Sequence, residues 1–374
     1  MDELRHRIEQ QIIMATDPIE AAEYRAQRAL VQARHGEFRL AEQEVVELRT
    51  RFGDGNHPRV SILILIAEGL ILYFRDLSRN SMNRIHLASA LSMSLQIKDL
   101  AATANSWLAH LYYNFDHFEK LSQSIVDTLA LAEHSAHDWI PRISLVIADT
   151  LQLSGNWSDA DHWYHIAHRY SIQQGDRLTL GAIIYNRLAA GLSKARADYA
   201  ANCVEKTDVR RWTTEAGSAE HFHVGLSMHA LPDLLNLCNA RAAFLENQFE
   251  LAVEQYSMIL SAESAKLCGL NNSLISSEIF LCKILCGRYQ LNELELNSLS
   301  FSACDDLPID DKMVYHSNLI EIYRKTDPRR IPESLQSAFS SSRDAYLSSK
   351  RQLAAQIVKV APALDDFIGL LNCK

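Results

Sequence analysis

The sequence predicts an all-α fold built from antiparallel helical hairpins, and three observations lead to this class. The 374 residues include only 13 glycines and 8 prolines, whereas sheet-rich folds need many tight turns. Apolar residues recur at the helical spacing over most of the chain. A short turn-and-helix motif also returns at multiples of about 40 residues. We therefore expect one elongated repeat array over residues 1–333 and C-terminal capping helices over residues 334–374.

The recurring motif places a small or polar turn residue before an aromatic residue, with an alanine three positions after the aromatic. The clearest copy has Gly155 at the turn, then Trp157, Ala160 and Tyr164. Glycine, asparagine and aspartate tolerate the left-handed backbone that ends a helix and reverses the chain. The alanine allows the two helices of a hairpin to approach closely.

The positions of the motif give the expected number of hairpins. Further copies have their turns near Gly36, Asp116, Asn247 and Gly287. The gaps between copies imply two degenerate units, whose turns we expect at 76–77 and at 197–199, with Asn202 in the alanine position. A last turn is expected at 326–328, because Pro328 cannot continue a helix. The array then contains about eight hairpins. The caps are expected as one helix over 334–350 and a second over 363–371.

This pattern resembles the tetratricopeptide repeat (TPR), whose units carry a glycine–aromatic–alanine series at the turn and in the second helix. Units near 40 residues are longer than the usual 34 and resemble the bacterial regulatory arrays of the MalT, Rap and PlcR types. The resemblance implies a right-handed superhelical α-solenoid. It also implies a non-catalytic scaffold whose first helices line a concave groove for a protein or peptide partner.

Projecting the turn register onto the first helices predicts which side chains line that groove. The combination of cations, amides and aromatic rings suits an extended peptide of acidic character, because arginine and lysine bind carboxylates. The alternative interpretation is a set of solvated surface residues. The expected groove residues are His110, Tyr113, Asn114, Arg142, Asp149, Gln152, Arg187, Lys194 and Arg241.

Residues 203–232 form a longer connection than a hairpin requires. They carry Arg210, Arg211 and Trp212, together with three histidines. The segment is interpreted either as an inserted recognition loop or lid, with these three residues contacting the ligand, or as a longer loop with a hydrophobic anchor.

The net charge and the cysteines indicate which partners the protein can bind and in which cellular compartment it resides. The net charge of −9 disfavours direct binding of nucleic acid or of an anionic membrane. The most apolar run, 60–74, is shorter than the roughly 20 residues of a membrane span, so we expect a buried helix. Seven cysteines without framework spacing indicate reduced thiols, and the charged N-terminus does not resemble a secretory signal. These features predict a cytoplasmic protein.

The sequence contains no phosphate-binding loop, nucleophile elbow or HExxH zinc motif. We therefore expect no enzymatic activity, no cofactor and no metal. The dipeptide His137-Asp138 leaves a metal-dependent hydrolase as a minor alternative. A second alternative is a regulator that responds to a peptide or small molecule and acts through a partner, and the array ends offer surfaces for a homodimer.

Overall fold

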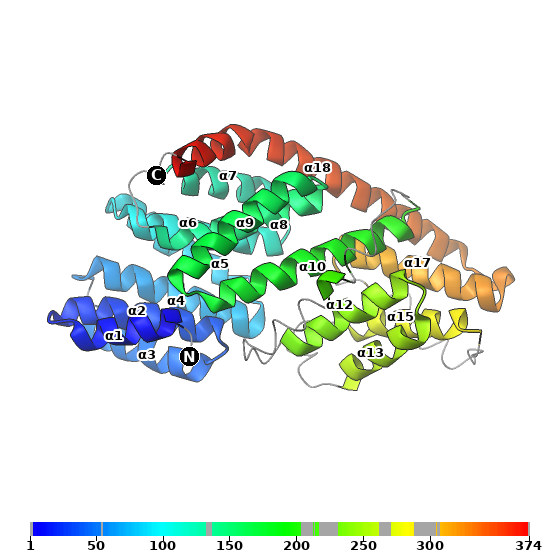
Figure 1. Ribbon diagram of the computed structural model, residues 1–374, viewed down its shortest axis with the longest axis horizontal. Helices are drawn as coiled ribbons and strands as arrows, with labels where there is room; N and C mark the ends of the chain where they lie inside the picture. The colour runs from blue at the N-terminus through cyan, green and yellow to red at the C-terminus, as the bar shows by residue number, and fades with distance from the viewer. Residues whose placement is uncertain are drawn as a thin grey trace. The chain divides into compact units, whose positions relative to one another are not determined.

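The computed structural model describes residues 3–53, 55–131, 137–202, 212, 214–216, 231–261, 271–287, 304 and 307–372. In this part of the chain the regular elements are all helical, and successive helices pack against one another (Figure 1). The predicted all-α class is thus confirmed for the described residues. The chain divides into two compact units, which are Met1–Ile183 with Gln352–Lys374 and Ile184–Arg351.

Unit 1 contains four successive hairpins, in which α2 pairs with α3, α4 with α5, α6 with α7, and α8 with α9. The first helices also contact one another, α2 with α4 and α6 with α8. The helices of unit 1 are α1 (Glu3–Met14), α2 (Pro18–Arg34), α3 (Phe38–Phe52), α4 (Pro58–Asp76), α5 (Asn80–Ser94), α6 (Lys98–Asn114), α7 (Phe118–Leu129), a 3₁₀ turn (His137–Trp139), α8 (Ile140–Ser154), α9 (Trp157–Gln174), the start of α10 (Arg177–Ala200) and the end of α18 (Glu333–Asn372).

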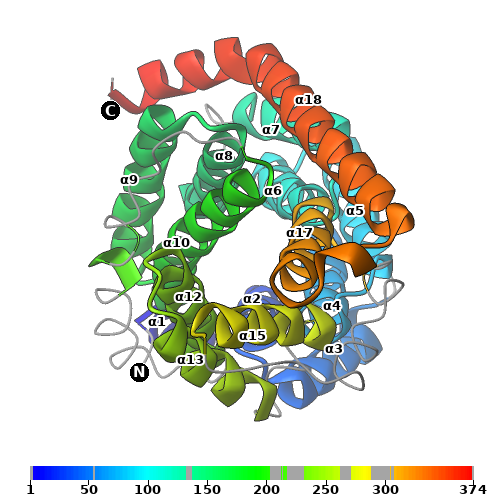
Figure 2. The ribbon, with the colours of Figure 1, turned by 90° about the vertical axis from the view of Figure 1, so that its right-hand side faces the viewer.

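In unit 2, helices that are consecutive in the chain also contact one another, as Figure 2 shows for α12, α13, α15 and α17. Its buried residues form two apolar clusters, one around Tyr256 and one around Tyr315. The helices are the rest of α10, α12 (Leu231–Leu245), α13 (Phe249–Ser261), α15 (Asn272–Leu285), α17 (Ile309–Thr326), a 3₁₀ turn (Pro328–Arg330) and the start of α18.

The turn residues carry the predicted recurrence. A residue with a left-handed backbone follows the first helix of each hairpin repeat, at intervals of 39 to 47 residues. The expected turns at Gly36, Leu77, Asp116, Gly155, Asn247 and Gly287 all have positive φ, and the last helix before the C-terminal segment ends at Thr326 as expected.

The turn predicted at 197–199 is wrong. These residues lie inside α10, and the left-handed residue is Asn202, with a φ of 55°. The helix continues because Lys194 forms an ion pair with Asp198 one turn later, at 2.5 Å, and Ala197 is buried. The alanine position assigned to Asn202 is therefore also wrong.

The motif alanines perform the expected packing role. Ala41, Ala160 and Ala252 are all at most 1% exposed. The apolar run 60–74 lies within α4 and is buried on nearly every side, as predicted. Small residues at these positions allow two backbones to come close enough to exclude water.

The C-terminal segment differs from the two helices predicted there, because α18 is a single helix of 40 residues that includes Pro362. Pro362 is exposed, whereas Val360, Leu364 and Phe367 are buried in the core of unit 1. An interior proline destabilises a helix by about 3 kcal/mol, and burying three large side chains offsets this loss. Figures 1 and 2 both show this end of α18 beside α7.

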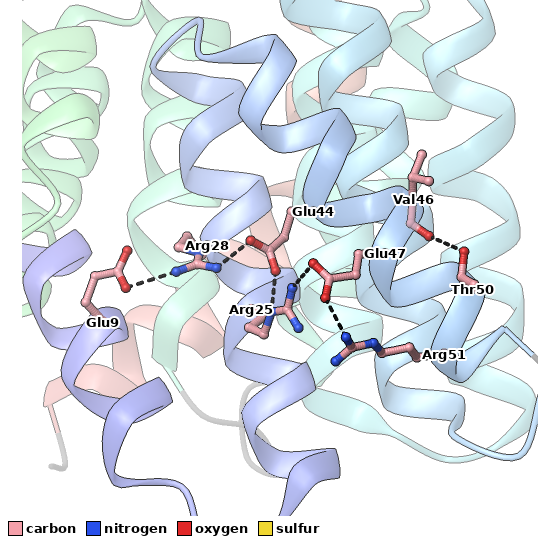
Figure 3. A network of polar contacts seen from close by, with 8 residues as sticks. All are labelled: Glu9, Arg25, Arg28, Glu44, Val46, Glu47, Thr50 and Arg51. Carbon is pink, nitrogen blue, oxygen red and sulfur yellow. Dashed lines mark hydrogen bonds and ion pairs between the residues drawn. The ribbon is translucent and has the colours of Figure 1, made fainter.

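The first three helices are joined by a ladder of alternating charges (Figure 3). Glu44 of α3 accepts hydrogen bonds from both Arg25 and Arg28 of α2, and is itself 8% exposed. The ladder extends to Glu9 of α1 at 3.0 Å from Arg28, and to Glu47 of α3 at 2.7 Å from Arg25. Because the buried Glu44 bridges two partly buried arginines, the ladder ties α3 to α2.

Candidate functional site

Two arginines from different hairpins converge on one tryptophan ring in unit 1. Trp107 lies in the middle of α6, Arg142 in the first turn of α8, and Arg34 is the last residue of α2. The guanidinium carbon of Arg142 is 4.3 Å from the centroid of the Trp107 ring, and that of Arg34 is 5.9 Å away. Both are within cation–π distance. We call these three residues, with His110, Asp176 and Thr179, the Arg–Trp cluster.

Asp176 forms an ion pair with only one of the two guanidinium groups. Its carboxylate accepts a hydrogen bond from Arg34 at 3.0 Å, and it caps α10 by accepting the Thr179 N–H at 3.0 Å and the Thr179 hydroxyl at 2.7 Å. Burial opposes its ionisation, but Arg34, the two Thr179 donors and the charge of Arg142 outweigh burial, so the pKa of Asp176 is lowered. The Asp176 carboxylate therefore accepts three hydrogen bonds, two at Oδ1 and one at Oδ2.

Arg142 lacks such a partner. It is 8% exposed, and its hydrogen bond to the Thr179 hydroxyl is long, at 3.4 Å. It forms no ion pair with any carboxylate of the described residues. Burial, followed by repulsion from Arg34, lowers the pKa of Arg142 to about 9, so the guanidinium still carries its charge at neutral pH.

Aromatic rings complete the cluster. His110, one helical turn after Trp107, stands edge-on to the rings of Trp107 and Tyr73, with centroids 5.5 and 5.3 Å away. Burial, Arg142 and Arg34 hold the pKa of His110 well below its usual value, so the imidazole is neutral at pH 7. Burial also raises the pKa of Tyr73 to about 12. Two cations, Arg34 and Arg142, thus lie near two carboxylates, because Asp149 as well as Asp176 acts on Arg142.

The remaining predicted groove residues of unit 1 lie close to this cluster along the helices but have different environments. Asn114 is exposed and donates to the His110 carbonyl at 2.7 Å, and Tyr113 is half-buried. Asp149 and Gln152, by contrast, are 3% and 1% exposed, and both accept hydrogen bonds from the Tyr164 hydroxyl, at 2.7 and 2.6 Å. These two side chains join α8 to α9.

The predicted residues of unit 2 are engaged in pairs within the unit. Arg187 lies 3.4 Å from Glu215, and Lys194 pairs with Asp198. Arg241 is 8% exposed; it donates to Ser193 at 3.2 Å and lies 3.7 Å from Asp311. All three cations therefore have intramolecular partners.

In the connection 203–232, Arg210 and Arg211 lie outside the described residues. Trp212 is 3% exposed and packs on Gly191 of α10, where an added Cβ would come within 2.4 Å of its ring. This placement agrees with the interpretation of Trp212 as a hydrophobic anchor.

Sequence reasoning missed a second buried network, in unit 2. Arg196 of α10 is 3% exposed and contacts Glu278 of α15 and, at 2.6 Å, Asp311 of α17. Sequence reasoning also missed Arg34, Trp107 and Asp176. Of these residues, only Asp176 could have been recognised from the neighbouring sequence, because an aspartate three residues before Thr179 is a helix-capping pattern.

Other candidate chemistry receives little support. No group of three or more His, Cys, Asp or Glu residues in the described ranges is arranged to hold a metal ion. Cys304 Sγ lies 3.2 Å from His316 Nε2, and the thiol is 1% exposed. The side chain of His137, from the dipeptide named above, lies outside what is described. Among the described helices, none has both the length and the apolar character of a membrane span.

A scan against protein-family models, a search of curated proteins and a search of solved structures each found no match to this chain.

Proposed function

We propose that this protein is a non-catalytic scaffold that binds a protein or peptide partner, and that its hairpins form a right-handed, TPR-like solenoid. The support is the regular recurrence of left-handed turn residues together with the buried alanines that follow three of the turns. Repeats of helical hairpins present extended surfaces, and such surfaces bind partners. We place the protein in the cytoplasm, as a regulatory adaptor.

The observation that carries the proposal is the Arg–Trp cluster. Arg34, Trp107 and Arg142 come from the first helices of three different hairpins, which are the helices expected to line the groove of such an array; Trp107 and Arg142 are themselves only 5% and 8% exposed. A cation–aromatic combination is typical of interaction hot spots, in which arginine and tryptophan are enriched. Further along α6, His110 is half-buried and Asn114 is exposed, so the helix reaches solvent beside the cluster.

A second candidate function is a regulator that responds to a small molecule or peptide and acts through a partner. The burial of Arg142 favours it, because a deeply placed charge suits a compact ligand group better than a flat protein surface. Both functions use the same residues, so one experiment addresses both.

The test is cross-linking mass spectrometry on the tagged protein isolated from its native cells, followed by affinity measurement with any partner found. We expect the α6 double variant His110→Ala/Asn114→Ala to weaken binding at least tenfold. The matched control is His162→Ala/His165→Ala on α9, where both histidines are exposed. A partner that loses affinity for the α9 variant, while binding the α6 variant normally, contradicts the proposed surface.

A further inference from the structure

The solvent-exposed face of α9 carries two histidines three positions apart, His162 and His165. We propose that these two side chains form a binding site for a divalent transition-metal cation, with Cu²⁺ bound most tightly and water in the remaining coordination positions. The site lies on a different helix from the Arg–Trp cluster, so it is an activity in addition to the proposed partner binding. It departs from the expectation of no metal, which rested on sequence motifs.

The first step is the orientation of α9, which its buried side chains fix. Four residues interleaved with the two histidines belong to the core of unit 1 and are at most 6% exposed, namely Trp163, Tyr164, Ile166 and Ala167. The histidines therefore face solvent. Side chains three positions apart on a helix are neighbours, with Cβ atoms about 5–6 Å apart. The same spacing, in the Glu-x-x-His motif of helical bundles, brings two side chains to a metal centre.

The second step is the position of the ring hydrogen of His165. Its Nδ1 lies 2.7 Å from the backbone carbonyl oxygen of Asp161. A carbonyl oxygen only accepts hydrogen bonds, so Nδ1 carries the hydrogen, and in the neutral ring Nε2 carries the lone pair. Histidine ligands of metal ions have this arrangement, in which a carbonyl or carboxylate holds the other ring nitrogen and orients the imidazole. The exposed His165 thus presents Nε2 as a metal ligand.

The third step is the choice between two histidine pairs, because His168 is also exposed and lies three positions after His165. The charges favour the pair of His162 and His165. Asp159 is exposed three positions before His162, whereas the cationic Arg169 directly follows His168. A carboxylate attracts a divalent cation and a guanidinium repels it. Within the described ranges no group of three or more His, Cys, Asp or Glu residues is arranged to hold a metal, so the protein supplies two ligands.

The type of ligand determines which cation binds. Neutral imidazole suits copper, nickel and zinc ions, whereas magnesium and calcium ions prefer oxygen ligands. Among the divalent ions of the first transition row, affinity for a given set of nitrogen ligands is highest for Cu²⁺. A site with two imidazoles and water should therefore bind Cu²⁺ more tightly than Ni²⁺ or Zn²⁺, and it should show no detectable binding of Mg²⁺.

The experiment is equilibrium dialysis of the full-length protein, without a histidine tag, against Cu²⁺ buffered with glycine. Glycine competes for the ion and suppresses binding at single histidines. The variants are His162→Gln and His165→Gln, and the control is His6→Gln at an exposed position of α1. We expect each of the two α9 variants to bind one Cu²⁺ fewer per chain than the wild type, or to bind it at least tenfold more weakly. H6Q should bind as the wild type does.

The outcomes that overturn the proposal are specific. Equal Cu²⁺ binding by the wild type, H162Q and H165Q, or an equal loss in H6Q, would show adventitious surface binding only. A loss in H168Q together with normal binding in H162Q would refute the proposed pair. The electron paramagnetic resonance spectrum of the bound Cu²⁺ should show coupling to two imidazole nitrogens, and coupling to one or none would contradict the site. Partner affinity does not enter these measurements, so their failure leaves the scaffold function standing.

Discussion

Gly69 lies in the middle of α4, at the point where the Ile85 side chain of α5 packs on its Cα. A Cβ at this position would come 2.6 Å from Ile85 Cδ1 and 3.2 Å from the Ser81 carbonyl oxygen. The absence of a side chain is therefore what allows this hairpin to close. Gly369 on α18 differs in this respect, because nothing lies within 4 Å of the corresponding Cβ.

We expect Gly69→Ala to lower the free energy of unfolding by about 1–2 kcal/mol, since overpacking outweighs the better helix propensity of alanine. Gly369→Ala, in the same unit, should raise it by about 0.5–1 kcal/mol. Urea denaturation of both variants measures the two changes. A Gly69→Ala protein as stable as the wild type would mean that Ile85 moves aside without loss.

At the scale of elements, α18 shows how a helix is defined by what it packs against. Phe367 stacks on Trp163 of α9, with ring centroids 5.9 Å apart and planes 9° from parallel, and it also contacts Trp139 at 5.9 Å. Gln356 on the same helix accepts a hydrogen bond from Ser122 of α7 at 3.2 Å. The end of α18 is thus an integral part of unit 1, although it lies at the other end of the sequence.

Removing the Phe367 side chain, which holds the end of α18 against α9, should destabilise unit 1. We expect Phe367→Ala to lower the free energy of unfolding by about 3–5 kcal/mol, because it removes a fully buried aromatic ring and leaves a cavity. Val358 on the same helix is 73% exposed, and Val358→Ala should change stability by less than about 0.5 kcal/mol. Hydrogen exchange of α7 and α9 would report the loss directly; unchanged protection in Phe367→Ala would contradict the anchoring role.

At the scale of the whole molecule, each unit contains a buried aspartate that ties distant segments together. In unit 1, Asp176 binds Arg34 across 142 positions of sequence. In unit 2, Asp198 accepts hydrogen bonds from Lys194, Tyr346 and Lys350. Burial opposes the ionisation of Asp198, but Lys194 and Lys350 outweigh it, so its pKa is lowered as that of Asp176 is.

These lowered pKa values fix the sign of the pH dependence. A carboxylate whose pKa is lower in the folded than in the unfolded state stabilises the fold above its unfolded pKa of about 3.9, and loses that contribution as the pH falls toward its folded value. We expect Asp176→Asn to lower the free energy of unfolding at pH 7 by about 3 kcal/mol, because it breaks a buried ion pair. The loss should shrink as the pH is lowered below about 4.

The control for this series is Asp365→Asn, a change of the same kind at an exposed position of α18. It should leave the unfolding free energy at pH 7 within about 0.5 kcal/mol of the wild-type value. Denaturation at several pH values between 3 and 7 measures both variants. A destabilisation by Asp176→Asn that does not change with pH would show that its ion pair is not the source of the effect.

Local chemistry made much of the fold predictable. Gly36, Gly155 and Asn247 mark turns because few residue types adopt a left-handed backbone, and Ala41 or Ala160 mark close helix contacts because only a small side chain fits there. Such preferences act within a few residues, so a single sequence displays them. Of the Arg–Trp cluster, only Arg142 and His110 were anticipated, through their positions on first helices.

The sequence by itself therefore determined the helical class, the repeat length and most turns, because these depend on short-range backbone preferences. The tertiary structure alone decided that Arg34 pairs with Asp176 and that Arg142 is left without a carboxylate, because such pairings join residues far apart in the chain. It also decided that α10 continues through 197–199 and that α18 continues through Pro362. In α10 the ion pairs of Asp198 with Lys194 and with the distant Lys350 outweigh the local signal for a break, and in α18 the burial of Val360, Leu364 and Phe367 does so.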